Sequence, residues 1–427
     1  MLQLQIETPI KGYNQHVRDN RLQFLKLIEI ISRKPQTLHG SILFIVFVMN
    51  EITSWPLLRL WNVYNAESDF IDLRWLWYSA ECYNDVGLEI YGTKGTYCGG
   101  YQYGIFPIKF INFFNISELW VQVLGYSMIA FFCFLMSNFL YPLCALTPYK
   151  NTLFYLVSTS PVMMLFVQRG QIDLLVTFSI FFSLKVSLMP KASWILAIGS
   201  VMLLSLVTLI KIYPILILFL MSVLSKKHLL KFIHLLPIPI LLPYLVKDLS
   251  LIPLKINSYV DGTGMTFGYL NIATQISNTQ SFQLSSIEIM IVSLVLHLLL
   301  LFAVLMIFNK KFSLIKQKEA LGSKIAVPYL VWTITFLGCY FLGNNIDFRQ
   351  IFAMLAIFYL CRAISDAKGT QLLLTLLFFN NYLSYQSGGM EVFGDISIAL
   401  TATILACYLV WDLLVKLKRE RATDVTL

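Results

Sequence analysis

The residues best suited to chemistry lie in a short acidic and aromatic stretch, Ser68-Asp69-Phe70-Ile71-Asp72, which is followed by Trp75 and Trp77. Asp69 and Asp72 are three residues apart, so their carboxylates can share one face of a helical turn. A carboxylate enclosed by aromatic rings near a membrane surface can have its basicity tuned for general-base catalysis. Two plainer interpretations are open as well: either aspartate caps a short helix, or it is a solvated charge.

Three later polar segments each contain a basic residue between apolar runs. They are Gln168-Arg169-Gly170-Gln171-Ile172-Asp173, Lys211-Ile212-Tyr213-Pro214 and Asn344-Asn345-Ile346-Asp347-Phe348-Arg349-Gln350. A basic residue at such a position can snorkel to the interface, pair with Asp173 or Asp347, or bind a lipid phosphate. For Lys211 and Arg349 snorkelling and phosphate binding are equally good interpretations, whereas Arg169 is expected to pair with a carboxylate.

The elements that must position these residues follow from composition. Of the 427 residues 57% are apolar and 13% are charged, against about 25% charged in soluble domains. The mean hydropathy is +0.71, which favours an all-α polytopic membrane protein and leaves no room for a large soluble domain. Hydropathy predicts about twelve transmembrane helices, at residues 41–58, 118–140, 152–168, 172–188, 193–210, 212–225, 232–246, 286–308, 325–343, 350–365, 370–386 and 394–415.

The distribution of charge predicts the topology. With the N-terminus inside and alternating sides, 23 of the 32 Lys and Arg residues fall on the cytoplasmic side, as the positive-inside trend requires. Both termini are then cytoplasmic, residues 1–40 form a cytoplasmic or interfacial arm, and residues 41–427 form one transmembrane domain. The net charge of +9 is explained in this way without a nucleic-acid partner.

This topology places all the polar segments on the outer side, together with one long loop at residues 59–117. The loop contains 15 aromatic residues, too many for a disordered linker. We therefore expect a folded first extracytoplasmic loop made of short interfacial helices capped by Gly87, Gly92 and Gly95. Cys82 and Cys98 lie in this loop and can form a disulfide if it faces an oxidising compartment, although free thiols are equally compatible with the sequence.

The order of these motifs resembles that of the GT-C membrane glycosyltransferases. It is most similar to glycosyltransferase family 87, the mannosyltransferases that use polyprenyl-phosphate-mannose. The resemblance covers about residues 41–230 and rests on the Ser-Asp-Phe start of the first outer loop, the Phe-Pro at 106–107, the Gly-Gln-x-Asp at 170–173 and the Lys-x-x-Pro at 211–214. Relatives often carry Tyr-Pro-Pro at the end of the loop, where this chain has Tyr103-Gly104-Ile105-Phe106-Pro107.

The resemblance implies a catalytic role for the first outer loop. Asp69 matches the general base of the family, with Asp72 as the second candidate. Arg349, Lys211 and Arg169 are the expected ligands of the donor phosphate, and Trp75, Tyr103, Gln171 and Asp173 are expected to bind substrate. No metal and no cofactor is expected, because a departing lipid phosphate needs only modest help and the sequence has no His/Cys cluster with ligand spacing. His228 and His297 stand alone in the sequence and are interpreted as interface and packing residues.

The expected partners are a polyprenyl-phosphate sugar, a lipid-linked or glycan acceptor and membrane lipid. A transporter or flippase of lipid-linked sugars is the main alternative, but such proteins usually show internal repeats, and the Ser-Asp-Phe loop has no second copy. A polysaccharide polymerase or ligase is the other alternative, for which residues 247–285 are the only candidate loop. The expected location is a bacterial inner membrane, with the active site extracytoplasmic.

Overall fold

A computed structural model describes residues 41, 44–45, 70–91, 103–136, 156–189, 193–211, 213–224, 228–251, 266–267, 272–273, 277, 284–311, 323–341, 345–346, 350–363, 367–383 and 389–424. The described chain is helical apart from one two-stranded ladder. The predictions for the arm at residues 1–40 and for nearly all of the span at 41–58 lie outside these ranges.

The first group of helices begins with the loop helices. The elements are α3 (Ile71–Val86), the 3-10 helix η2 (Gly87–Tyr91), α4 (Ile105–Phe114), α5 (Leu119–Leu135), α8 (Pro161–Gln168), α9 (Asp173–Leu188), α10 (Trp194–Ile210), α11 (Pro214–Leu224), α12 (His228–Leu235) and α13 (Pro237–Leu251). Helix α8 begins where Ser160 accepts a hydrogen bond from the Met163 amide, and Pro161 occupies its first turn. Helix α9 has Asp173 in its first turn and Lys185 in its last, which suits the helix dipole.

The second group consists of α15 (Ser286–Lys311), α16 (Ser323–Phe341), α17 (Gln350–Ala363), α18 (Ala367–Leu383) and α19 (Gly389–Asp424). By length and composition, three stretches of the described chain can cross a membrane: Leu230–Lys247, Ile287–Met306 and Phe393–Val410. Seven further apolar helices are shorter. The prediction of an all-α membrane protein therefore agrees with the structure at this level, and the loop at residues 59–117 is helical in its described part, with Gly87 ending α3 at a φ of 59°.

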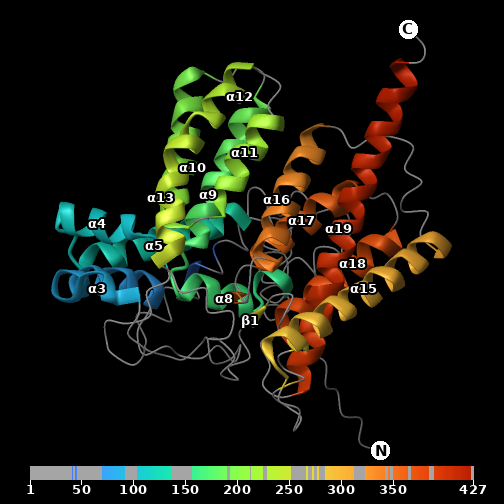
Figure 1. Ribbon diagram of the computed structural model, residues 1–427, viewed down its shortest axis with the longest axis horizontal. Coiled ribbons are helices and arrows are strands. Elements are labelled where there is room, and N and C mark those ends of the chain that lie inside the picture. Colours follow the sequence, from blue (N-terminus) through green and yellow to red (C-terminus); the bar gives the residue numbers. More distant parts are fainter. Residues whose placement is uncertain are drawn as a thin grey trace, which may run out of the picture.

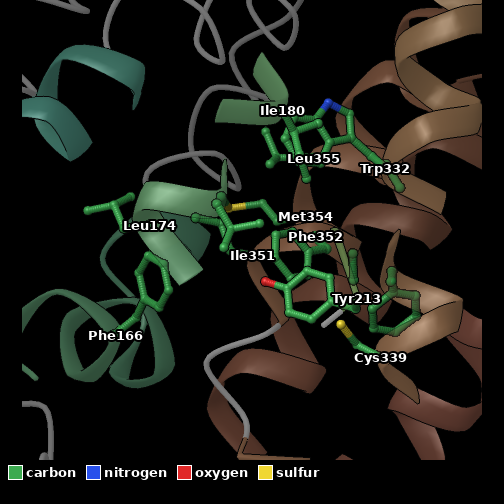
Figure 2. Close-up of a cluster of buried hydrophobic side chains, with 14 of the residues drawn as sticks. Phe166, Leu174, Ile180, Tyr213, Trp332, Cys339, Ile351, Phe352, Met354 and Leu355 are labelled. Atoms are coloured by element: carbon green, nitrogen blue, oxygen red, sulfur yellow. The ribbon is translucent and has the colours of Figure 1, made fainter. Parts of the chain in front are cut away.

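The two groups lie next to each other, with α9 to α13 upright on one side and α15 to α19 on the other (Figure 1). Helices α3 and α4 run crosswise at one end of the first group, where α4 contacts α10 and α3 contacts α5. Side chains from α8, α9, α16 and α17 meet where the two groups join (Figure 2). Trp332 stacks on Phe352 there, at 6.2 Å between ring centroids, and both rings are buried.

The ladder joins two segments that are far apart in the chain. Strand β1 (Thr266–Phe267) pairs antiparallel with β2 (Asn345–Ile346), so that Thr266 lies opposite Ile346 and Phe267 opposite Asn345. The two segments come from the loops at 247–285 and 344–349, which the charge distribution assigns to the same side of the membrane.

Candidate functional site

The start of α3 is held by a buried aromatic ring. Phe70 has a φ of 56° and precedes the helix in the left-handed conformation, which is uncommon for a bulky residue. Its ring packs so closely on Gly125 of α5 that a Cβ there would lie 2.5 Å from the ring. Gly170 has a φ of 62°, and a Cβ on it would lie 2.9 Å from Leu73. Close packing against these two glycines therefore fixes α3 to α5 and to the α8–α9 connection.

An ion pair with two hydrogen bonds crosses this contact. Arg169 donates from Nε to Asp72 Oδ2 at 3.1 Å and from an Nη to Asp72 Oδ1 at 2.7 Å. The Asp72 amide in turn donates to the Arg169 carbonyl at 3.0 Å. Both carboxylate oxygens of Asp72 are thus occupied by a two-pronged guanidinium contact. The expectation that Arg169 pairs with a carboxylate is confirmed, and Asp72 does not cap α3, whose N-cap is Phe70 without a side-chain cap bond.

A second ion pair is more deeply buried. Lys211 Nζ lies 3.0 Å from Asp173 Oδ2, and the two side chains are 8% and 0% exposed. The Tyr213 hydroxyl donates to the other oxygen of the same carboxylate. Asp173 belongs to the start of α9 and Lys211 to the end of α10, so this pair ties two helix ends together. Of the three sequence interpretations of Lys211, pairing with Asp173 is the one that the structure contains.

Tyr103 and Gly104, near the end of the first loop, lie next to the buried ion pair of Lys211 and Asp173. The Lys211 ammonium lies 4.9 Å from the centre of the Tyr103 ring, within the range of a cation–π interaction. The Gly104 amide donates to the Ile210 carbonyl at 3.3 Å. Segments around residues 104 and 173 therefore meet at Ile210, Lys211 and Tyr213, and the segment around residue 72 adjoins them through Arg169.

Gln171 lies between the two ion pairs in the chain. The residue is 1% exposed, and within the part of the chain that the structure describes its Oε1 has no hydrogen-bond partner. A buried amide oxygen that accepts nothing costs free energy. This oxygen is therefore ready to accept a hydrogen bond from a hydroxyl or amine of a bound molecule.

The position of Tyr213 links this polar cluster to the hydrophobic core. Its ring lies 5.8 Å from that of Phe352 in the first turn of α17, in an edge-on arrangement (Figure 2). The same residue thus contacts the carboxylate of Asp173 through its hydroxyl and the second helix group through its ring. Tyr213 belongs to the Lys-x-x-Pro motif, but no role for it was predicted from the sequence.

Further polar contacts that sequence analysis missed hold α3 to the segments after it. Arg74 forms an ion pair with Glu118. The Trp77 indole donates to the Ile116 carbonyl at 2.8 Å, and Asn112 donates to the Ala80 carbonyl at 3.1 Å. These contacts make α3, α4 and the start of α5 one packed unit.

The remaining predicted site residues do not join this cluster among the described contacts. Trp75 is 38% exposed on α3. Asp69 and Arg349 lie outside the described residues, Asp69 two positions before α3 begins. Their roles as base and phosphate ligand stay predictions.

Cys82 is buried in α3 and is disulfide-bonded. The other described cysteines, Cys133, Cys339, Cys361 and Cys407, form no disulfide, so the partner of Cys82 lies outside the described part of the chain. The pairing with Cys98, which also lies there, stays a prediction.

Within the described ranges, no group of three His, Cys, Asp or Glu side chains could hold a metal ion. The chemistry that the cluster offers is that of paired charges: two carboxylates, an ammonium and a guanidinium at one end of an apolar helix bundle. Such groups can recognise and stabilise a phosphate or a hydroxylated molecule when the ion pairs rearrange.

The fold and this site define an all-α protein with helices long and apolar enough for a membrane, which carries a buried, charge-paired polar cluster at one end of its helices. No family model, curated protein or solved structure matches the chain.

Proposed function

We propose that the chain is an integral membrane glycosyltransferase, which transfers a sugar with inversion from a polyprenyl-phosphate donor to a lipid-linked or glycan acceptor. A mannose-like sugar is the donor that the resemblance favours. The proposal includes twelve spans, both termini in the cytoplasm, a bacterial inner membrane and an active site on the outer side.

The observation that carries the proposal is the convergence of the motif segments. Asp72 of the first loop meets Arg169, Asp173 meets Lys211, and Tyr103 lies under the Lys211 ammonium. The segments are separated by as many as 97 residues in the case of Asp72 and Arg169. In a glycosyltransferase the catalytic base, the sugar and the donor phosphate must meet at one point. The segments that meet here contain or adjoin the residues proposed for these roles.

The chemistry then follows from the roles of the residues. Asp69 removes the proton of an acceptor hydroxyl, whose oxygen attacks the anomeric carbon from the face opposite the phosphate. The bond between that carbon and the phosphate oxygen breaks, and the lipid phosphate leaves with the electron pair. Lys211 and Arg349 stabilise the negative charge that grows on the phosphate, an electrostatic contribution of about 3 kcal/mol per donor.

The contacts of Asp72 favour Asp69 as the base. Both oxygens of Asp72 accept hydrogen bonds from Arg169, so Asp72 acts as the anchor of that guanidinium. Arg169 can reach a phosphate only if it leaves this pair, and Lys211 only if it leaves Asp173, so both would bind phosphate by exchanging a carboxylate for it. The Oε1 atom of Gln171 is suited to accept a sugar hydroxyl.

The proposal is tested with purified protein in lipid nanodiscs and radiolabelled polyprenyl-phosphate-mannose. Asp69→Asn should abolish transfer and leave donor binding intact, whereas Asp72→Asn should lower stability and retain measurable transfer. Full activity of Asp69→Asn would remove it as the base. Arg349→Ala should weaken donor binding more than acceptor binding. Movement of the donor across a vesicle membrane without transfer would favour the transporter alternative.

A further inference from the structure

The two ion pairs of the candidate site differ in the contacts that surround them. Asp72 accepts from Arg169 with both carboxylate oxygens, and within the described ranges no other side chain donates a hydrogen bond to it. Asp173 binds Lys211 with one oxygen, which lies 3.0 Å from Nζ, and accepts from the Tyr213 hydroxyl with the other. Opening the first pair therefore removes every described side-chain partner of its carboxylate, whereas opening the second leaves one in place.

Each charge of the second pair has a further stabilising contact. The Asp173 carboxylate accepts from Tyr213 and also lies in the first turn of α9, where the helix dipole favours negative charge. The Lys211 ammonium lies 4.9 Å from the centre of the Tyr103 ring, and the face of an aromatic ring attracts a cation. Separation of the pair thus leaves neither charge without a favourable contact, and an uncompensated charge is the main cost of breaking a buried ion pair.

Only one side chain has to move for this pair to open. The Lys211 amide donates to the Val207 carbonyl at 2.9 Å, which holds the backbone at the end of α10. The ammonium itself is carried on a flexible four-carbon stem. The Tyr213 ring packs edge-on against Phe352, with 5.8 Å between the ring centroids. This packing keeps the tyrosine hydroxyl beside Asp173 while the ammonium moves.

We propose that Lys211 and Asp173 form an exchangeable ion pair, which opens so that the Lys211 ammonium binds a phosphate oxyanion in place of the carboxylate. Tyr213 is a positioning residue in this exchange, because its hydroxyl continues to compensate the Asp173 carboxylate after the ammonium has turned to the phosphate. Tyr103 does the same for the ammonium while it is between partners. This role rests on the proposed function, in which the phosphate is the one that joins the polyprenyl chain to the sugar.

The exchange has a specific signature, because the carboxylate and the phosphate compete for one ammonium. Removal of the carboxylate charge should strengthen phosphate binding, although it breaks an ion pair of the native structure. Asp173→Asn keeps the shape of the side chain and an oxygen that can accept from the Tyr213 hydroxyl, and it frees Lys211 from its competitor. The affinity for a phosphate that binds elsewhere in the protein would not respond to this change.

The test measures equilibrium binding of radiolabelled polyprenyl phosphate and of inorganic phosphate to the full-length protein. The protein is held in nanodiscs of phosphatidylcholine, so that no anionic lipid competes. Asp173→Asn should bind polyprenyl phosphate at least about tenfold more tightly than the wild type, since close charge pairs interact by more than about 1.4 kcal/mol. Lys211→Met combined with Asp173→Asn should lose this gain, because no ammonium is left.

The positioning role of Tyr213 is tested in the same assay. Tyr213→Phe keeps the ring against Phe352 and should weaken phosphate binding at least about fivefold, because the exposed carboxylate charge loses its hydrogen bond. In the Asp173→Asn background the same change should alter the affinity less than about twofold, since no charge needs compensation. Tyr329→Phe is the matched control, because this buried hydroxyl donates to the Leu405 carbonyl at 3.3 Å in the second helix group.

Unchanged affinity for both phosphates in Asp173→Asn would overturn the exchange, and so would equal effects of Tyr213→Phe and Tyr329→Phe. A gain with polyprenyl phosphate alone identifies a lipid-linked phosphate as the ligand, whereas an equal gain with inorganic phosphate identifies the phosphate group itself. If the wild type transfers sugar but Asp173→Asn binds no more tightly, the exchange is wrong and the proposed function stands. If phosphate binding responds as expected but no sugar is transferred, the exchange stands and the proposed function fails. If Asp173→Asn does not fold, the comparison of the two tyrosine variants decides.

Discussion

Replacement of Lys211 by Met isolates the buried charge of Asp173. The ammonium and the carboxylate are 3.0 Å apart, and the Asp173 side chain is fully buried. Removal of one partner of a buried ion pair typically costs about 3–5 kcal/mol, because the other charge is left without compensation. The Tyr213 hydroxyl still donates to Asp173 in the variant, so we expect the lower end of this range, about 3 kcal/mol.

The loss is measured by reversible unfolding of purified protein in mixed detergent micelles. A loss of 3 kcal/mol lowers the folding equilibrium constant about 150-fold, since each 1.4 kcal/mol is a factor of ten. The double variant Lys211→Met with Asp173→Asn should recover at least about 2 kcal/mol, because no buried charge is left. Lys109→Met is the matched control, since Lys109 is exposed on α4, and it should change the stability by less than about 0.5 kcal/mol.

Two outcomes would contradict this account of the pair. If Lys211→Met costs no more than Lys109→Met, Asp173 is not an uncompensated buried charge in that variant. If the double variant is as unstable as the sum of its two single changes, the two side chains do not interact.

Two further predictions concern the attachment of α3. Arg169→Lys cannot reproduce the bidentate contact with Asp72 and should lower the free energy of unfolding by about 1–2 kcal/mol in the same assay. If the variant is as stable as the wild type, the ion pair does not stabilise the attachment of α3. Gly125→Ala should cost about 1–3 kcal/mol because the new methyl group meets the Phe70 ring. Gly199→Ala, in open space on α10, should instead stabilise by about 0.5–1 kcal/mol, and an equal effect of both changes would refute the close contact.

Helix positions could largely be predicted because hydropathy is a local property. The spans predicted at 172–188 and 193–210 coincide with α9 and α10 to within a residue. The span predicted at 232–246 lies within Leu230–Lys247, which can cross a membrane by length and composition, but it is made of two helices, α12 and α13, which are separated at Leu236 beside a run of prolines. Hydropathy averages over such an interruption, because proline changes the backbone more than the apolar character of the window.

The partners within the site could be predicted only in part from the sequence. The basic residues of the site were recognised from their positions between apolar runs, and Asp173 and Asp347 were the expected partners. Arg169 instead pairs with Asp72, which is 97 residues away, and Lys211 forms an ion pair with Asp173. The carboxylate with which a basic side chain pairs depends on how the helices pack. The sequence around Arg169 does not indicate that its partner lies on α3. The contact between His297 and the Tyr340 hydroxyl was missed for the same reason, since the two residues are 43 positions apart.

The short ladder between β1 and β2 limits how the chain can be threaded through a membrane. Two hydrogen-bonded segments cannot lie on opposite sides of a hydrocarbon layer about 30 Å thick. The chain between Phe267 and Asn345 must therefore cross the bilayer an even number of times. If α15 crosses once, a return crossing must follow it, and α16 is the apolar helix that lies between α15 and β2. If α15 does cross, the two-residue ladder therefore couples it to a return crossing, whatever the total number of spans.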